Sequence, residues 1–183
     1  MGFVAALLLV FVDIPEDAFW CLCSVVEYLL PEDYYSATLL GLRTEQSVFT
    51  ELLHQKLPKL AMHFTRHQVI TELFATRWFV GIFANTLPTE TTLRVWDVFF
   101  FEGAKILHRI GIALLKVAEP SLLACESQQE LLPTGCGDQA REELAHQKRR
   151  TGNRPHLPSQ QQLFTSPLFV KSSKMEHVNC VVA

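Results

Sequence analysis

Apolar residues fill the first twelve positions of the chain. The run MGFVAALLLVFV holds one glycine and eleven apolar residues, and the first charged side chain is Asp13. A membrane-spanning helix needs about 20 such residues, and a secretory signal needs a positive charge ahead of its apolar run. The opening meets neither requirement. We therefore expect a core helix that is apolar on every side and needs protein around it.

After Asp13, apolar residues recur at spacings of three and four, which is the period of an amphipathic helix. The run VFFF could form a short buried strand, but no second strand candidate offers it a ladder. The first 132 residues are therefore predicted to be all-α, with about seven helices. Beyond the opening run we expect helices over about residues 13–30, 44–57, 59–66, 69–83, 91–101, 106–117 and 120–132, the last of them opened by Pro120.

The composition changes at Pro133, where the chain becomes polar and is broken by glycine and proline. We expect one domain over residues 1–132 and a low-order tail over residues 133–183 that orders only when something binds it. The domain carries 9 basic and 15 acidic side chains, net −6, and the tail carries 7 and 4, net +3, which sum to −3. Neither value indicates the concentrated basic face of a nucleic-acid-binding protein.

No residue pattern in the chain predicts an active site of its own. The seven histidines do not fall in a metal-ligand motif, and there is no phosphate-binding loop or nucleophile motif. We therefore expect no metal and no cofactor. An odd number of cysteines, five, at irregular spacing indicates reduced thiols in a cytoplasmic protein.

The last four residues, Cys180 to Ala183, read C-V-V-A and match the C-a-a-X pattern of prenylation, with a final alanine that specifies farnesyl. Cys180 is thus a candidate lipid-modification site. Stable anchoring usually takes a second signal, for which Lys171 and Lys174 offer only two charges. The tail therefore adds a membrane surface as a candidate partner.

The stretch RWFVGIFANTLPTETTLRVWDVFFFEGAKILHRIGIALL resembles the C-terminal half of a TBC domain, the helical module of GTPase-activating proteins for Rab GTPases. The resemblance extends over about residues 1–132. It implies an all-α fold, no cofactor and a GTP-loaded Rab partner in the regulation of vesicle trafficking. The family-motif positions that it marks as structural or Rab-facing are Trp78, Phe79, Arg94, Trp96, Asp97, Glu102 and Gly103.

The RVWD block also has a physical basis of its own. Arg94 stands three residues before Asp97 and four after Glu90, so ion pairs along one helix face can orient it. Trp96 is predicted to anchor the core. We interpret the block as holding the fold first and facing a partner second.

Two elements of the TBC family, I-x-x-D-x-x-R and Y-x-Q-G, do not occur in this sequence. In the family they supply an arginine and a glutamine to the nucleotide, and loss of an arginine finger costs about 10³ to 10⁵ in rate. The arginines of the matched region lie in the half that does not present the finger. We therefore predict no catalytic residue here, and no acceleration of GTP hydrolysis.

These observations lead to one main hypothesis and two alternatives. The main hypothesis is the C-terminal part of a Rab GTPase-activating protein, shortened ahead of an internal Met1 and cytoplasmic. The first alternative is a non-catalytic Rab-binding adaptor or decoy, held peripherally at membranes through a prenylated Cys180. The second is a fragment that folds poorly because its apolar surface is uncovered.

Overall fold

All regular elements of the described residues are helices. The computed structural model describes residues 1–125 and residue 131, and the all-α prediction is confirmed there, with the VFFF run inside a helix. The predicted boundary at residue 132 and the tail lie outside the described residues. The elements are α1 (Gly2–Phe11), α2 (Pro15–Ser24), the π-helix η1 (Val25–Leu29), α3 (Leu40–Lys56), α4 (Pro58–Arg66), α5 (Thr71–Val80), α6 (Thr89–Glu102) and α7 (Lys105–Ala124).

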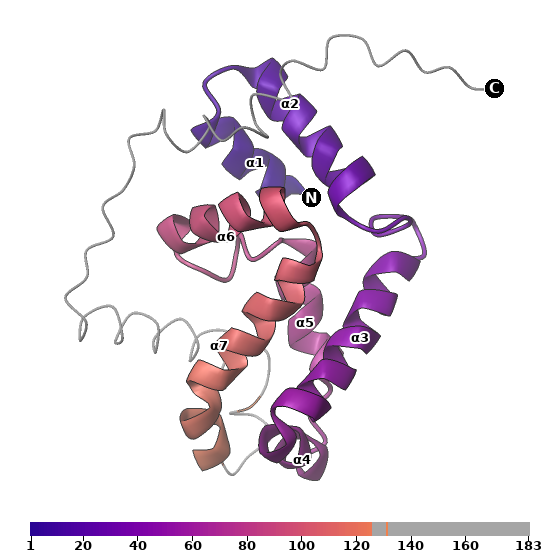
Figure 1. The fold of residues 1–183 in the computed structure, drawn as a ribbon, viewed down its shortest axis with the longest axis vertical. Coiled ribbons are helices and arrows are strands. Elements are labelled where there is room, and N and C mark those ends of the chain that lie inside the picture. Colours follow the sequence, from indigo (N-terminus) through magenta and orange to yellow (C-terminus); the bar gives the residue numbers. More distant parts are fainter. Residues whose placement is uncertain (126–130, 132–183) are drawn as a thin grey trace.

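The core lies where α3, α5 and α7 meet. α3 and α7 run along the long axis of the molecule, and α5 contacts both of them (Figure 1). The ring of Phe49 on α3 is fully buried, with its centroid 5.3 Å from that of Phe79 and 6.3 Å from that of Trp78. Edge-to-face pairs of this kind contribute about 0.5–1.5 kcal/mol beyond their buried area. The aromatic cluster therefore joins α3 to α5.

Gly111 allows α7 to approach this cluster closely. A Cβ atom added at Gly111 would lie 2.7 Å from Cε2 and 3.0 Å from Cζ of Phe49. Real Cβ atoms do not come this near to a carbon of a packed ring, because the interior is already close-packed. The absence of a side chain at this position sets the spacing between α3 and α7.

α3 begins at Leu40, four residues before the predicted start at about Thr44. Leu39, directly before the helix, has left-handed backbone with φ 52°. A Cβ atom at Gly41 would lie 2.8 Å from the backbone nitrogen of Tyr34. The start is thus set by packing against the preceding loop, and no capping side chain marks it. The prediction was wrong because such a contact leaves no periodic signal.

α7 continues through Pro120, where the pattern predicted a new helix. The proline ring removes the bond that would reach back to the carbonyl of Lys116. Both Pro120 and Lys116 are exposed, whereas Ala118 and Leu122 are buried. The lost bond therefore falls on the solvent side, and buried contacts on the other side hold the two halves in one helix.

α1 and α2 form a helical hairpin at the opposite end of the molecule from α4 (Figure 1). Only Val4 and Leu8 of α1 are buried, while Phe3, Leu9 and Val10 are 65%, 57% and 72% exposed. The described residues thus cover one side of α1 rather than all sides.

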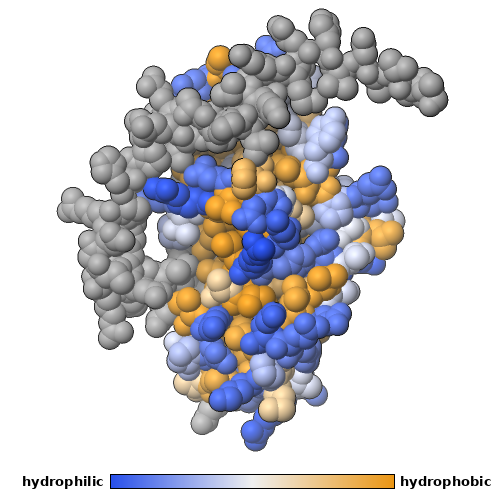
Figure 2. Space-filling model, in the orientation of Figure 1, coloured by the Kyte–Doolittle hydropathy of each residue, from blue (hydrophilic) through white to orange (hydrophobic). Residues whose placement is uncertain are grey.

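Apolar and polar side chains are interspersed over the face seen in Figure 2. No helix in the described part of the chain is long and apolar enough to cross a membrane.

Candidate partner-binding surface

α6 carries the RVWD block and is held to the rest of the fold by Trp96. This side chain is 5% exposed, and its indole Nε1 donates a hydrogen bond of 2.9 Å to the backbone carbonyl of Ile82. Ile82 and Phe83 form the turn after α5 with φ values of 46° and 61°. Left-handed backbone costs about 1–3 kcal/mol at residues with bulky side chains. The indole bond and the burial of Phe83 stabilise this strained turn.

The start of α6 follows from the residues that precede it. The backbone of Pro88 takes φ −56° and ψ 143°, which is extended, and the helix begins at the next residue. Thr92 is fully buried, and its hydroxyl donates to backbone carbonyls of Leu87 and Pro88 at 3.3 Å each. The side chain of Thr92 thus ties the loop to the first turn. This contact fixes which face of α6 points inward.

The outward face of α6 combines charge with exposed apolar side chains. Arg94, Asp97, Val98 and Phe101 are all exposed, and Phe101 is 77% exposed. Their spacing of three, one and three residues places them on one side of the helix. The opposite side holds the buried residues Thr92, Leu93, Val95, Trp96 and Phe99.

Arg94 and Asp97 lie about one turn apart on this face, and the positive charge of Arg94 acts on the Asp97 carboxyl. Burial raises the pKa of the Asp97 carboxyl, and the positive charge of Arg94 lowers it by less. The net direction is a raised pKa, although the Asp97 side chain is exposed. An arginine and an exposed aromatic ring on one helix face are side chains that are enriched at protein-binding surfaces.

Glu102 and Gly103 form the corner between α6 and α7. The Glu102 carboxylate contacts Lys105 Nζ at 3.2 Å and Arg109 Nη1 at 2.7 Å. The hydrogen bond from Lys105 lowers the pKa of Glu102 most, and burial opposes it. The charges of Arg109 and Lys105 lower the pKa further, so the net direction is downward. Gly103 has φ 79°, which glycine adopts without steric cost. These two residues shape the turn and lie next to the outward face.

Trp78 and Phe79 lie in the core, 1% and 0% exposed. Their rings pack against that of Phe49 and do not reach the outward face of α6. The seven family-motif positions therefore separate into three groups. Trp78, Phe79 and Trp96 are buried, Glu102 and Gly103 form a corner, and Arg94 and Asp97 lie on the surface.

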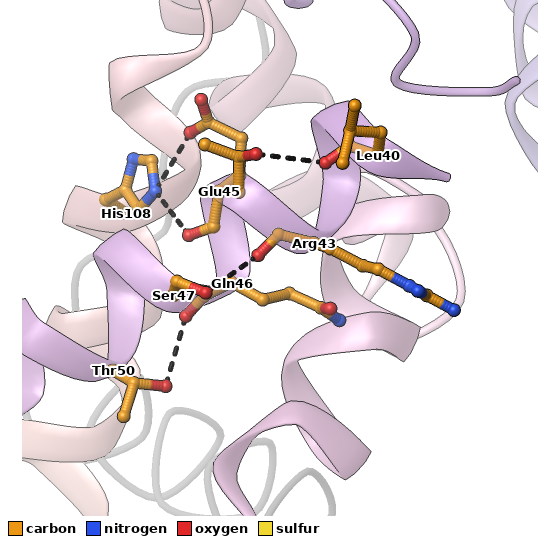
Figure 3. Close-up of polar contacts among 8 residues, drawn as sticks. Leu40, Arg43, Glu45, Gln46, Ser47, Thr50 and His108 are labelled. Carbon is orange, nitrogen blue, oxygen red and sulfur yellow. Dashed lines mark hydrogen bonds and ion pairs between the residues drawn. The ribbon is translucent and has the colours of Figure 1, made fainter. Parts of the chain in front are cut away.

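A polar contact that the sequence analysis missed fastens α3 to α7. His108 Nε2 lies 3.0 Å from the Glu45 carboxylate and 3.1 Å from the Glu45 backbone carbonyl (Figure 3). Both side chains are mostly buried, at 11% and 18% exposed. Burial lowers the pKa of His108, but the hydrogen bonds and charge of Glu45 outweigh it and raise the pKa overall. The two residues are 63 positions apart, so no local pattern could pair them.

The described residues show no candidate metal centre. Among them, no group of three or more His, Cys, Asp or Glu side chains is arranged to hold a metal ion. Cys180 lies outside the described residues. The outward face of α6 presents charged and apolar side chains to solvent.

Comparison with known proteins agrees with this architecture. The family model of the Rab-GTPase-TBC domain matches residues 1–123. TBC1 domain family member 2A of Mus musculus is 39% identical over 128 residues, which are 70% of this chain and 14% of that protein. Growth hormone-regulated TBC protein 1 of Rattus norvegicus is 40% identical over 131 residues, which are 72% of this chain and 45% of that protein.

A solved structure shows the same likeness in three dimensions. The crystal structure of the Chlamydomonas flagellar RabGAP TBC domain aligns with a TM-score of 0.69 and 34% identity. The alignment covers 78% of this chain and 47% of that one. The chain thus spans less than half the length of these relatives. By the family match over most of its length, the chain belongs to the Rab-GTPase-TBC domain family.

Proposed function

We propose that this chain binds a GTP-loaded Rab-type GTPase and does not accelerate GTP hydrolysis, acting in the regulation of vesicle trafficking. Membership of the Rab-GTPase-TBC domain family supports the choice of partner. The observation that carries the binding half is the outward face of α6, defined by Arg94, Asp97, Val98 and Phe101. An arginine and an aromatic ring on one rigid helix face are the side chains that most often dominate binding energy.

The non-catalytic half of the proposal rests on the sequence. Neither I-x-x-D-x-x-R nor Y-x-Q-G occurs among the 183 residues. Without an arginine that stabilises charge on the transferred phosphoryl group, a bound GTPase keeps about its intrinsic rate. Among the described arginines, Arg109 pairs with the Glu102 carboxylate, and the positive charge of Arg94 acts on the Asp97 carboxyl.

A second candidate function is that of an adaptor or decoy held at membranes. The C-a-a-X sequence at Cys180 favours it, because a farnesyl chain adds membrane affinity to a protein that is otherwise cytoplasmic. This version predicts co-sedimentation with vesicles when the chain is made in a eukaryotic host. A Cys180→Ser variant is then expected to remain in the supernatant, and equal sedimentation of both forms would contradict the adaptor.

Binding is tested with immobilised chain and a panel of purified Rab GTPases, each loaded with GDP or a non-hydrolysable GTP analogue. The expected result is saturable binding of at least one Rab, preferring the GTP analogue. An Arg94→Glu variant is expected to weaken this binding about 30-fold, the equivalent of a 2 kcal/mol hot spot. Arg43→Glu, an exposed arginine on α3, is the matched control and is expected to bind as the parent does.

Two outcomes would refute the binding proposal. One is no binding of any Rab by a chain that is folded by circular dichroism. The other is an equal loss of affinity in the Arg94→Glu and Arg43→Glu variants, which would assign the effect to net charge rather than to α6.

A further inference from the structure

α2 presents an aromatic pair to solvent at the end of the molecule away from α4. Phe19 and Trp20 are 56% and 52% exposed, and their rings meet edge to face with centroids 5.3 Å apart. The buried side of the same helix holds Ala18 and Cys21. An exposed tryptophan next to an exposed phenylalanine is uncommon on a monomer surface and is typical of a binding site.

The charged side chains of α2, and of the two elements that it contacts most, α1 and η1, are all acidic. Glu16 is exposed one turn before Phe19 and Trp20, and Asp17 lies beside it. No basic side chain occurs before Arg43, whereas six acidic ones do: Asp13, Glu16, Asp17, Glu27, Glu32 and Asp33. An occupant of this surface therefore needs positive charge as well as apolar side chains. A second copy of the same surface does not fit, because like charges would face each other.

One segment of this chain has the matching chemistry. Residues 163–174, LFTSPLFVKSSK, carry two aromatic rings and three aliphatic residues besides proline, and they contain no acidic residue. The apolar part is followed by Lys171 and Lys174. The preceding part of the tail, by contrast, is polar. Residues 132–162, which connect Leu131 to this segment, number 31 and can span up to about 100 Å when extended. A folded domain of about 125 residues has a radius of gyration of only about 14 Å, so the segment can reach α2.

We propose that residues 163–174 bind to the exposed face of α2 formed by Glu16, Asp17, Phe19 and Trp20. The apolar part of the segment covers the two rings, and its lysines meet the two carboxylates. Tethering holds such a segment at an effective concentration of about 1 mM, so a contact with a Kd of about 0.1 mM is about nine-tenths occupied. A modest contact therefore suffices to cover the aromatic pair.

Trp20 itself reports on this contact in the full chain. Trp78 and Trp96 are 1% and 5% exposed, so acrylamide quenching of tryptophan fluorescence is dominated by Trp20. We expect weak quenching in the parent chain. In a Phe164→Ser, Phe169→Ser variant and in a Lys171→Glu, Lys174→Glu variant, we expect a several-fold larger quenching constant. Both variants change only residues beyond the described helices, so circular dichroism is expected to match that of the parent.

Two controls separate a specific contact from general attraction between tail and domain. Lys148→Glu with Arg149→Glu makes the same charge change elsewhere in the tail and is expected to leave quenching as in the parent. Adding Glu16→Lys to the Lys171→Glu, Lys174→Glu variant is expected to restore part of the shielding, because one opposite-charge pair is re-formed.

Three results would overturn the proposal. The first is full accessibility of Trp20 in the parent chain, as in a free tryptophan peptide. The second is equal quenching in the segment variants and the Lys148→Glu, Arg149→Glu control. The third is shielding that disappears on dilution, which would assign the occupant to another copy of the chain.

Discussion

Removing the charge from Glu45 is predicted to destabilise the fold by an amount that depends on pH. His108 donates from Nε2 to both the carboxylate and the backbone carbonyl of Glu45 (Figure 3). In Glu45→Gln the side-chain oxygen still accepts a hydrogen bond from His108. The stability lost is therefore only the extra contribution of the carboxylate charge to that bond. Hydrogen bonds to charged groups contribute about 1.5–3 kcal/mol and neutral ones about 1 kcal/mol. The expected loss is therefore about 1 kcal/mol when His108 is protonated.

The direction of the pH dependence follows from the raised pKa of His108. A group whose pKa is higher in the folded protein stabilises it fully below the unfolded value, which is about 6.5 for histidine. That stabilisation is lost as the pH rises through the folded pKa. The Glu45→Gln variant should thus lose about 1 kcal/mol at pH 5.5 and much less at pH 8.5.

Thermal and urea unfolding of both proteins by circular dichroism measure this difference. A change of 1 kcal/mol corresponds to about 4 °C in Tm for a domain of this size. Comparing variant with parent at each pH cancels the titration of the other groups. Glu51→Gln, an exposed carboxyl on the same helix, is the matched control. A destabilisation that is equal at the two pH values, or larger at pH 8.5, would refute the ion pair.

Three further predictions address the core and the thiols. Gly111→Ala should lower the free energy of unfolding by about 1–3 kcal/mol, because the added Cβ meets the Phe49 ring. Gly2→Ala, where nothing lies within 4 Å of the added Cβ, should leave it unchanged, and equal urea midpoints for the two variants would contradict this. Trp96→Phe should cost about 2 kcal/mol in urea unfolding, since it leaves a buried carbonyl unpaired; a loss below 0.5 kcal/mol would show that water replaces the bond. Burial raises the pKa of the Cys21 thiol to about 12, so Cys21 in the native protein should resist alkylation by iodoacetamide at pH 8. Peptide mass spectrometry measures this labelling, and rapid labelling of Cys21 in the folded chain would disprove the prediction.

Much of the helical order was predictable because the buried faces recur at helical spacing. The alternation of exposed and buried residues in α6 follows from RVWD and its neighbours, and it correctly separated Trp96 from Arg94 and Asp97. The errors fall where tertiary contacts override local signals. Pro120 was predicted to open a new helix but lies inside α7, because the bond that it removes faces solvent.

The polar contacts of the core were not predictable from the pattern. Glu45 looks like one more solvated residue near a helix start, and His108 like one of seven scattered histidines. Only the packing of α3 on α7 brings them together. The exposure of Phe19 and Trp20 was equally hidden, since helical spacing alone assigns aromatic residues to a core.

The central claim is that the chain binds a GTP-loaded Rab without accelerating hydrolysis. A single-turnover phosphate-release assay tests both parts, with a Rab that the chain binds and a catalytically competent TBC domain that acts on it. The chain alone is predicted to leave the intrinsic rate unchanged. Added to the competent domain, it should slow hydrolysis by competing for the Rab. Acceleration by the chain alone, approaching the 10³-fold or more that an arginine finger supplies, or no slowing at any concentration, would contradict the account.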